Sequence, residues 1–98
     1  MSQKPGYWIA HVHVTDPESY ARYVEGARAA FEKYGAEFLA RGGRHAELEG
    51  AQGRERHVVI RFASYQQALD CYGSPEYQAA RKHRENAGEA TLTIVEGL

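Results

Sequence analysis

The chain has few of the features that identify many protein classes. It has one cysteine, Cys71, in 98 residues, which excludes an internal disulfide framework and is typical of a reducing compartment. Its formal net charge is −1, so it has no overall attraction for nucleic acid. No apolar run approaches the roughly 20 residues that span a bilayer, and residues 1–6 lack the apolar segment of a signal peptide. We therefore expect a cytoplasmic protein with neither a nucleic-acid nor a membrane partner.

Motifs of several enzyme classes are also absent. The sequence has no Gly-x-Gly-x-x-Gly run, no phosphate-binding loop, no Gly-x-Ser-x-Gly and no His-Glu-x-x-His. These runs place the glycines, nucleophile or metal ligands that each chemistry needs. Nucleotide hydrolysis, serine hydrolysis and zinc-peptidase chemistry therefore have no support in the sequence, and we expect neither a metal nor a cofactor.

The hydrophobic pattern predicts four strands. Residues 7–14, Arg56–Phe62 and 91–96 alternate with a period of two, as a strand with two distinct faces does. Residues 37–41 predict another strand, which either ends at Gly42-Gly43 or resumes over residues 44–48. The composition, 43% apolar and 26% charged, suits one globular domain over residues 1–98.

Two helical segments separate these strands. Asp16 before Pro17 is a capping residue followed by a proline at the first helical position, and Gly35 is a helix end. A second helical segment begins at Ser64 and is broken at Gly73. The order β-α-β-β-α-β predicts the α+β class, with a ferredoxin-like antiparallel sheet and both helical segments on one face.

Both faces of the predicted sheet carry apolar residues. In residues 7–14 one alternating set is apolar throughout, and the other combines Tyr7 and Ile9 with His11 and His13. The helices of the same chain can cover one face, whereas the second needs another cover, and a second copy of the chain is the simplest one. We therefore expect a homodimer through the open sheet face, with the two histidines and Arg61 at or near the interface.

Several runs in the chain resemble one small bacterial family of unknown function. They are Tyr7-Trp8, Thr15-Asp16-Pro17, Phe38-Leu39-x-Arg41-Gly42-Gly43, Leu48-Glu49-Gly50 and Ser74-Pro75-Glu76-Tyr77-Gln78. The resemblance covers nearly the whole chain and implies a branch of the dimeric α+β barrel superfamily, in which two ferredoxin-like chains pack sheet against sheet. That superfamily includes cofactor-free oxygenases, haem-degrading enzymes, lactone isomerases and simple ligand binders, so the resemblance implies a fold and not a reaction.

The run Arg41-Gly42-Gly43 is the strongest candidate binding motif. Glycine lets a ligand or another backbone approach closely, and the arginine offers a planar fork of donors to a carboxylate or phosphate. The alternative is a bent strand whose arginine pairs with a nearby carboxylate. Arg61 is a second candidate for an anion, and an intersubunit salt bridge to Glu37 or Glu96 is its alternative.

The histidines of the open face are candidate proton-transfer groups. His11 and His13 share one strand face, and His57 lies on the strand expected beside it. Two alternatives stay open: an open metal site of three imidazoles, and a hydrogen-bonded barrel lining with no ligand. His11 and His13 are not hallmarks of the family, so a mechanism that uses them would belong to this chain.

Tyr20 and Tyr23 are candidate ligand contacts on the helix side of the sheet. They lie on the opposite side from the histidines and Arg61. One pocket can therefore combine tyrosine with Arg41 only if the bend at Gly42-Gly43 turns that arginine toward the helices.

Together these residues predict a protein that binds a small anionic metabolite. Such a protein is either a ligand binder or a cofactor-independent enzyme of the oxygenase or isomerase type. In the enzyme hypothesis Arg41 or Arg61 holds the anion, and His11 or His13 transfers a proton. The rival hypothesis is a non-catalytic dimeric binding or stress-related module whose polar lining is structural. The sequence identifies neither the substrate nor the reaction.

Overall fold

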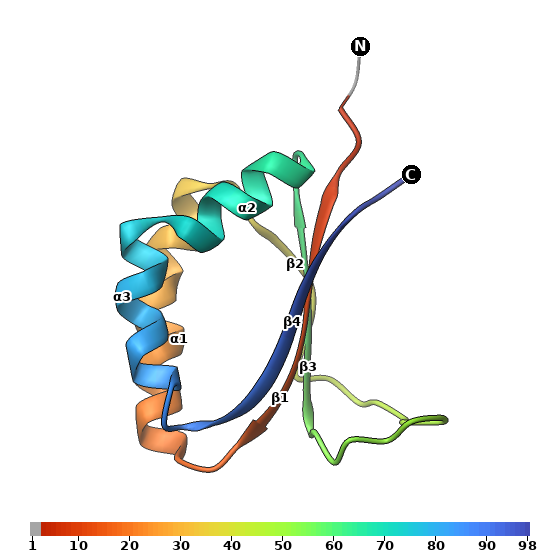
Figure 1. The fold of residues 1–98 in the computed structure, drawn as a ribbon, viewed down its shortest axis with the longest axis vertical. Helices are drawn as coiled ribbons and strands as arrows, with labels where there is room; N and C mark the ends of the chain where they lie inside the picture. The colour runs from red at the N-terminus through yellow and green to blue at the C-terminus, as the bar shows by residue number, and fades with distance from the viewer. Residues whose placement is uncertain (1–2) are drawn as a thin grey trace.

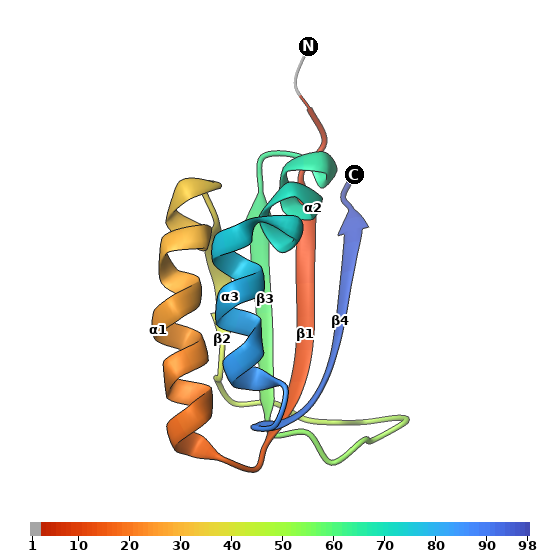
Figure 2. The same ribbon diagram turned by 60° about the vertical axis from the view of Figure 1, so that its left-hand side comes forward.

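In the computed structural model, which describes residues 3–98, one face of a four-stranded antiparallel sheet is covered by three helices (Figures 1 and 2). The elements in chain order are β1 (Gly6–Val14), α1 (Pro17–Lys33), β2 (Glu37–Arg41), β3 (Arg56–Phe62), α2 (Tyr65–Gly73), α3 (Pro75–Arg84) and β4 (Gly88–Glu96). The strand order is β2-β3-β1-β4, and all neighbouring strands are antiparallel. The predicted α+β class and ferredoxin-like arrangement are confirmed.

The helices begin where the capping residues predict. The side chains of Asp16, Ser64 and Ser74 each accept a hydrogen bond from a backbone N–H in the first turn of the helix that follows. Gly35 follows the end of α1 with a φ of 68°, which favours glycine. Local hydrogen bonding thus fixes the ends of these helices, as the sequence predicts.

Two strand boundaries differ from the prediction. Residues 44–48 are not a strand, because Gly42 has a φ of 68° and directs the chain out of β2. Residues 42–55 instead form a long loop on the side of the sheet opposite the helices (Figure 1). In addition, β4 begins at Gly88, three residues before the predicted start, because it pairs with β1 along its whole length.

Trp8 is the centre of the core between the sheet and the helices. It is 1% exposed, and its ring lies 5.0–5.9 Å, centroid to centroid, from the rings of Phe31, Phe62, Tyr72 and Tyr77. Burying one large apolar side chain contributes about 1.5–3 kcal/mol. The alternating set that contains Trp8 is therefore the inner face, as predicted.

No helix or strand of residues 3–98 covers the other face of the sheet (Figure 1), and only the 42–55 loop lies against it, at the end that carries His11 and His57. Tyr7, Ile9 and His11 of β1 and Val59 of β3 point to this side and are half-buried by their own neighbours, while Val95 of β4 is 45% exposed. Among the described residues, no helix has the length and apolar composition needed to cross a membrane.

Candidate functional site

A β-bulge in β2 decides on which side of the sheet Arg41 lies. The pairing of β2 with β3 shifts by one position between Phe38 and Ala40, so Leu39 is an extra residue. Because side chains alternate between faces along a strand, an extra residue reverses the alternation beyond it. Arg41, which pairs with Val58, consequently lies on the helix side of the sheet.

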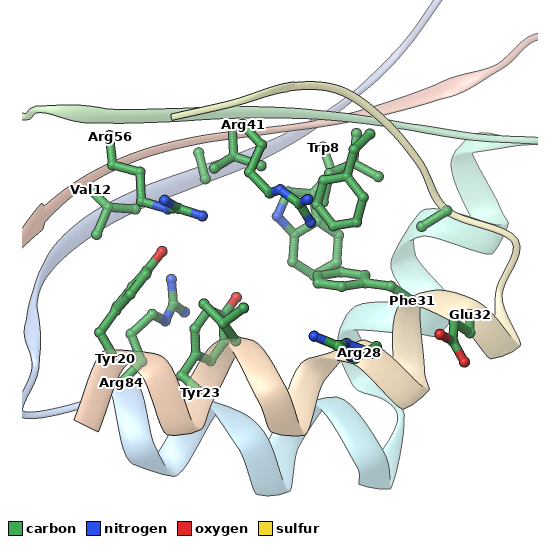
Figure 3. Close-up of a pocket in the computed structure, with 16 residues that line it drawn as sticks. Trp8, Val12, Tyr20, Tyr23, Arg28, Phe31, Glu32, Arg41, Arg56 and Arg84 are labelled. Carbon is green, nitrogen blue, oxygen red and sulfur yellow. The ribbon is translucent and has the colours of Figure 1, made fainter. Parts of the chain in front are cut away.

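Arg41 faces a cleft of about 450 Å³ between the sheet and the helices (Figure 3). The cleft has apolar and aromatic walls, which include Trp8, Ala10, Val12, Tyr20, Tyr23, Val24, Phe31, Ala36, Phe38, Val58 and Ile60. Its charged lining residues are Arg28, Arg41, Arg56, Arg84 and Glu32. Four guanidinium groups and one carboxylate therefore line this space, which strongly favours negative charge.

Three of these arginines share one arrangement, in which the guanidinium group lies over an aromatic ring. The distance from the guanidinium carbon to the ring centroid is 4.6 Å for Arg41 over Phe38, 5.4 Å for Arg56 over Tyr20 and 5.0 Å for Arg84 over Tyr23. Ring contact holds a guanidinium group without using its N–H donors. None of the ion pairs within residues 3–98 involves these three arginines.

Arg56 is the most confined of the three. It pairs with Val12 on the inner face of the sheet, and its Nε is buried with no hydrogen-bond partner among the described residues. A Cβ atom at Gly42 would lie 3.1 Å from its Nη1, so the glycine leaves room for the guanidinium group. Gly42 thus lies beside the Arg56 guanidinium group but does not line the cleft, whereas a Cβ at Gly43 would contact nothing within 4 Å.

Tyr23 connects the cleft to the core. Its hydroxyl oxygen lies 2.9 Å from that of Tyr77, and the pair is buried. Burial is the main cause that raises the pKa of Tyr23. Tyr23 is therefore a neutral hydrogen-bonding phenol at physiological pH.

The histidines gather on the opposite face of the sheet. His11 and His57 are directly opposite each other in β1 and β3, with 2.7 Å between their Nδ1 atoms. The ring centroid of His45, from the loop after β2, lies 4.4 Å from the ring centroid of His57. These rings border a second hollow, of about 410 Å³. No group of three or more His, Cys, Asp or Glu side chains in residues 3–98 is arranged to hold a metal ion.

His13 and Arg61, on the same face, have carboxylate partners in their own chain. The Nδ1 of His13 lies 2.9 Å from Oε2 of Glu55. The backbone N–H of Val14 and then the His13 imidazole lower the pKa of Glu55 to about 2. The Nη1 of Arg61 lies 3.7 Å from Oε2 of Glu37, and both side chains are exposed. The sequence predicts, as one alternative for Arg61, a salt bridge to Glu37 between subunits. The structure shows this ion pair within one chain.

The structure separates the predicted site residues into two groups. Tyr20, Tyr23 and Arg41 line the cleft, whereas His11, His13 and Arg61 lie on the other side of the sheet. The bulge at Leu39, and not the bend at Gly42-Gly43, brings Arg41 to the tyrosines. The roles of both groups remain predictions.

Three arginines that line the cleft, Arg28, Arg56 and Arg84, are absent from the site residues that the sequence predicts. Arg56 belongs to the same alternating set as Val58 and Ile60, so the strand period already places it on the helix side. Arg28 follows Val24 by four residues on α1, and Arg84 follows Tyr77 by seven on α3. A search for charged residues on the apolar stripes would have found all three.

Comparison with known proteins identifies the family. The model of DUF1330, a domain of unknown function, matches residues 5–98, so the chain belongs to this family. No curated protein matches it significantly.

Solved structures share the fold at low sequence identity. RPA0582, a protein of unknown function from Rhodopseudomonas palustris, has a TM-score of 0.80 and 21% identity over 98% of this chain and 84% of its own. SnoaB, a cofactor-independent oxygenase from Streptomyces nogalater, has a TM-score of 0.59 and 12% identity over 94% and 91%. A dimeric ferredoxin-like protein of unknown function from Bacteroides fragilis has a TM-score of 0.56 and 14% identity over 98% and 99%. These likenesses show the fold alone.

Proposed function

We propose that this member of the DUF1330 family binds a small organic anion in the cleft between the sheet and the helices. One observation carries the proposal: Arg41, Arg56 and Arg84 face one cavity, and none of them takes part in an ion pair within residues 3–98. Like charges held together in a partly apolar space destabilise a fold unless a counter-charge joins them. An anionic ligand supplies that counter-charge.

The geometry of Arg56 supports the same proposal. The Tyr20 ring holds its guanidinium group at the cleft, and a carboxylate there would accept from the terminal N–H groups of Arg56. Its Nε is enclosed by the protein and lies out of reach of a ligand. The aromatic wall around Trp8 and Phe31 would contact the apolar body of such a ligand.

Catalysis in this cleft, if the protein is an enzyme, would use other groups than His11 and His13. The two histidines lie on the far side of the sheet, so they cannot reach a ligand held by Arg41. Proton transfer would fall to Glu32 or Tyr20, which line the cleft. The cofactor-independent oxygenase of the same fold supports the enzymatic form of the proposal. The proposal that the cleft binds an anion does not depend on catalysis, because the arginines favour an anionic ligand whether or not a reaction follows.

We also propose that the chain works as a homodimer through its open sheet face, in the cytoplasm, where its single buried thiol would stay reduced. Tyr7, Ile9 and Val59 form an apolar strip on that face, and the dimeric protein of the same fold from Bacteroides fragilis supports a second copy as its cover. Light scattering at micromolar concentration should give the mass of a dimer, and Ile9→Lys the mass of a folded monomer. A monomeric wild-type chain would contradict this part of the proposal.

The binding proposal is tested by thermal shift and calorimetry with an aromatic carboxylate such as benzoate. A ligand at about 100 times its Kd stabilises a protein by about 2.7 kcal/mol, which raises the Tm of a domain this size by roughly 10 °C or more. We expect saturable binding that Arg56→Gln abolishes and that the matched variant Arg61→Gln, on the other face, retains. Loss of binding in Arg61→Gln alone would move the site to the open face. No saturable binding of any organic anion would refute the proposal.

A further inference from the structure

Tyr23 and Tyr77 share a hydrogen bond at the boundary between the cleft and the core. Their hydroxyl oxygens lie 2.9 Å apart, and in the part of the chain that the structure describes neither hydroxyl has another hydrogen-bond partner. Tyr23, 8% exposed, lines the cleft, whereas Tyr77, 0% exposed, does not. Figure 3 shows the hydroxyl group of Tyr23 pointing from α1 into the cleft. The two ends of this hydrogen bond therefore lie in different surroundings.

The pair of hydroxyl groups holds two protons, and only one of them can lie between the two oxygens. Burial is the main cause that raises the pKa of both Tyr23 and Tyr77, so each phenol keeps its proton at physiological pH. One hydroxyl donates to the other, and the second hydroxyl needs an acceptor elsewhere. The direction of the hydrogen bond thus decides which of the two tyrosines has a free O–H.

The burial of Tyr77 decides this direction. Its ring lies 5.0 Å from that of Trp8 and 5.3 Å from that of Tyr72, centroid to centroid, in the aromatic core. If Tyr23 were the donor, the proton of Tyr77 would be buried there without an acceptor, which destabilises a fold. If Tyr77 is the donor, the free O–H is that of Tyr23, at the cleft. The second arrangement is favoured because it leaves no unsatisfied donor in the core.

Two arginines beside this tyrosine supply donors and no acceptor. The guanidinium carbon of Arg84 lies 5.0 Å from the centroid of the Tyr23 ring. The Tyr20 ring, 5.4 Å from that of Tyr23, has the guanidinium carbon of Arg56 at 5.4 Å from its centroid. Glu32, the carboxylate among the lining residues, lies at the other end of the cleft in Figure 3. An anion bound beside Arg84 is therefore the acceptor that the free O–H lacks.

We propose that Tyr23 donates its O–H to the carboxylate of the bound anion, while Tyr77 holds the Tyr23 oxygen from the core side. This inference rests on the proposed anion-binding function and adds an uncharged donor to the arginines of the same site. A hydrogen bond from a phenol to a carboxylate is charge-assisted and directional. The hydroxyl would therefore fix the position of the ligand's carboxylate next to Arg84.

Two substitutions remove the same hydrogen bond from its opposite ends. Tyr23→Phe removes the donor at the cleft, and Tyr77→Phe removes only the hydroxyl in the core. Calorimetry of the full chain with benzoate should give a Kd that is higher by about tenfold or more in Tyr23→Phe and within about threefold of the wild type in Tyr77→Phe. A purely structural role of the pair predicts equal changes in the two variants. An equal or larger loss of affinity in Tyr77→Phe, or no loss in Tyr23→Phe, would overturn the inference.

The double variant Tyr23→Phe/Tyr77→Phe separates binding from folding, because it leaves no unpaired hydroxyl in the core. It should bind benzoate as weakly as Tyr23→Phe does, and a Kd restored to that of the wild type would also overturn the inference. If Arg56→Gln abolished binding while Tyr23→Phe did not weaken it, the proposed function would stand and only the role of Tyr23 would fall. No saturable binding of any organic anion to the wild type would refute both.

Discussion

Replacing Arg56 by methionine tests whether the cleft is built for a ligand or for the stability of the fold. Methionine keeps an unbranched apolar side chain but lacks the guanidinium group, whose carbon lies 5.4 Å from the centroid of the Tyr20 ring. A buried N–H without a partner, such as its Nε, costs about 1–3 kcal/mol. The lost cation–π contact was worth about 0.5–1 kcal/mol. We therefore expect Arg56→Met to raise the free energy of unfolding of the ligand-free protein by up to about 2 kcal/mol.

Urea unfolding of the ligand-free protein measures this change, and a thermal melt should show a Tm higher by up to roughly 15 °C. Arg81→Met is the matched control, because Arg81 is also half-buried but donates to Gln78 at 3.1 Å and lies 3.8 Å from Glu85. Its loss should lower stability slightly. A fall of more than 1 kcal/mol in Arg56→Met, with little change in the control, would refute our reasoning and make Arg56 a structural residue.

Three further predictions concern other parts of the molecule. Tyr23→Phe should lower the free energy of unfolding in urea by about 1–3 kcal/mol, because it leaves the buried Tyr77 hydroxyl without its partner, whereas Tyr20→Phe should change it little. The pKa of Glu55 is lowered from 4.5 to about 2 by a backbone N–H and an imidazole that donate to it, so its contribution to stability is present above pH 4.5 and is lost as the pH falls toward 2. Stability curves of wild type and Glu55→Gln should therefore converge over that range, and a constant gap would contradict this. Burial raises the pKa of Cys71 to about 12, so a thiol reagent at pH 8 should modify it only on unfolding, and fast modification of the folded protein would be inconsistent with that burial.

The fold could be predicted from the sequence because its signals are local. The alternation in residues 7–14 assigns Trp8 to the inner face, and the Asp16-Pro17 pair sets the start of α1. Each signal depends on residues a few positions apart, which the periods of strands and helices relate directly. Local signals do not determine the course of the chain after β2, since Gly42-Gly43 permits either a bent strand or an exit from the sheet.

The candidate site could be predicted only in part. Tyr20 and Tyr23 were assigned to the helix side by the helical period, and they line the cleft. Strict alternation along β2 assigns Arg41 to the wrong side of the sheet, because it cannot include the extra residue, Leu39. A bulge belongs to the pairing of two strands and has no signature within one of them.

By itself the sequence determined the class of fold, the inner face of the sheet, the capped ends of the helices and the existence of an open second face. Only the tertiary structure decided that Arg41, Arg56 and Arg84 share one cleft and that His11 and His13 lie apart from it. The reason is physical. Periodicity assigns a residue to a face of its own element, whereas a site depends on register and packing between elements that are distant in the chain.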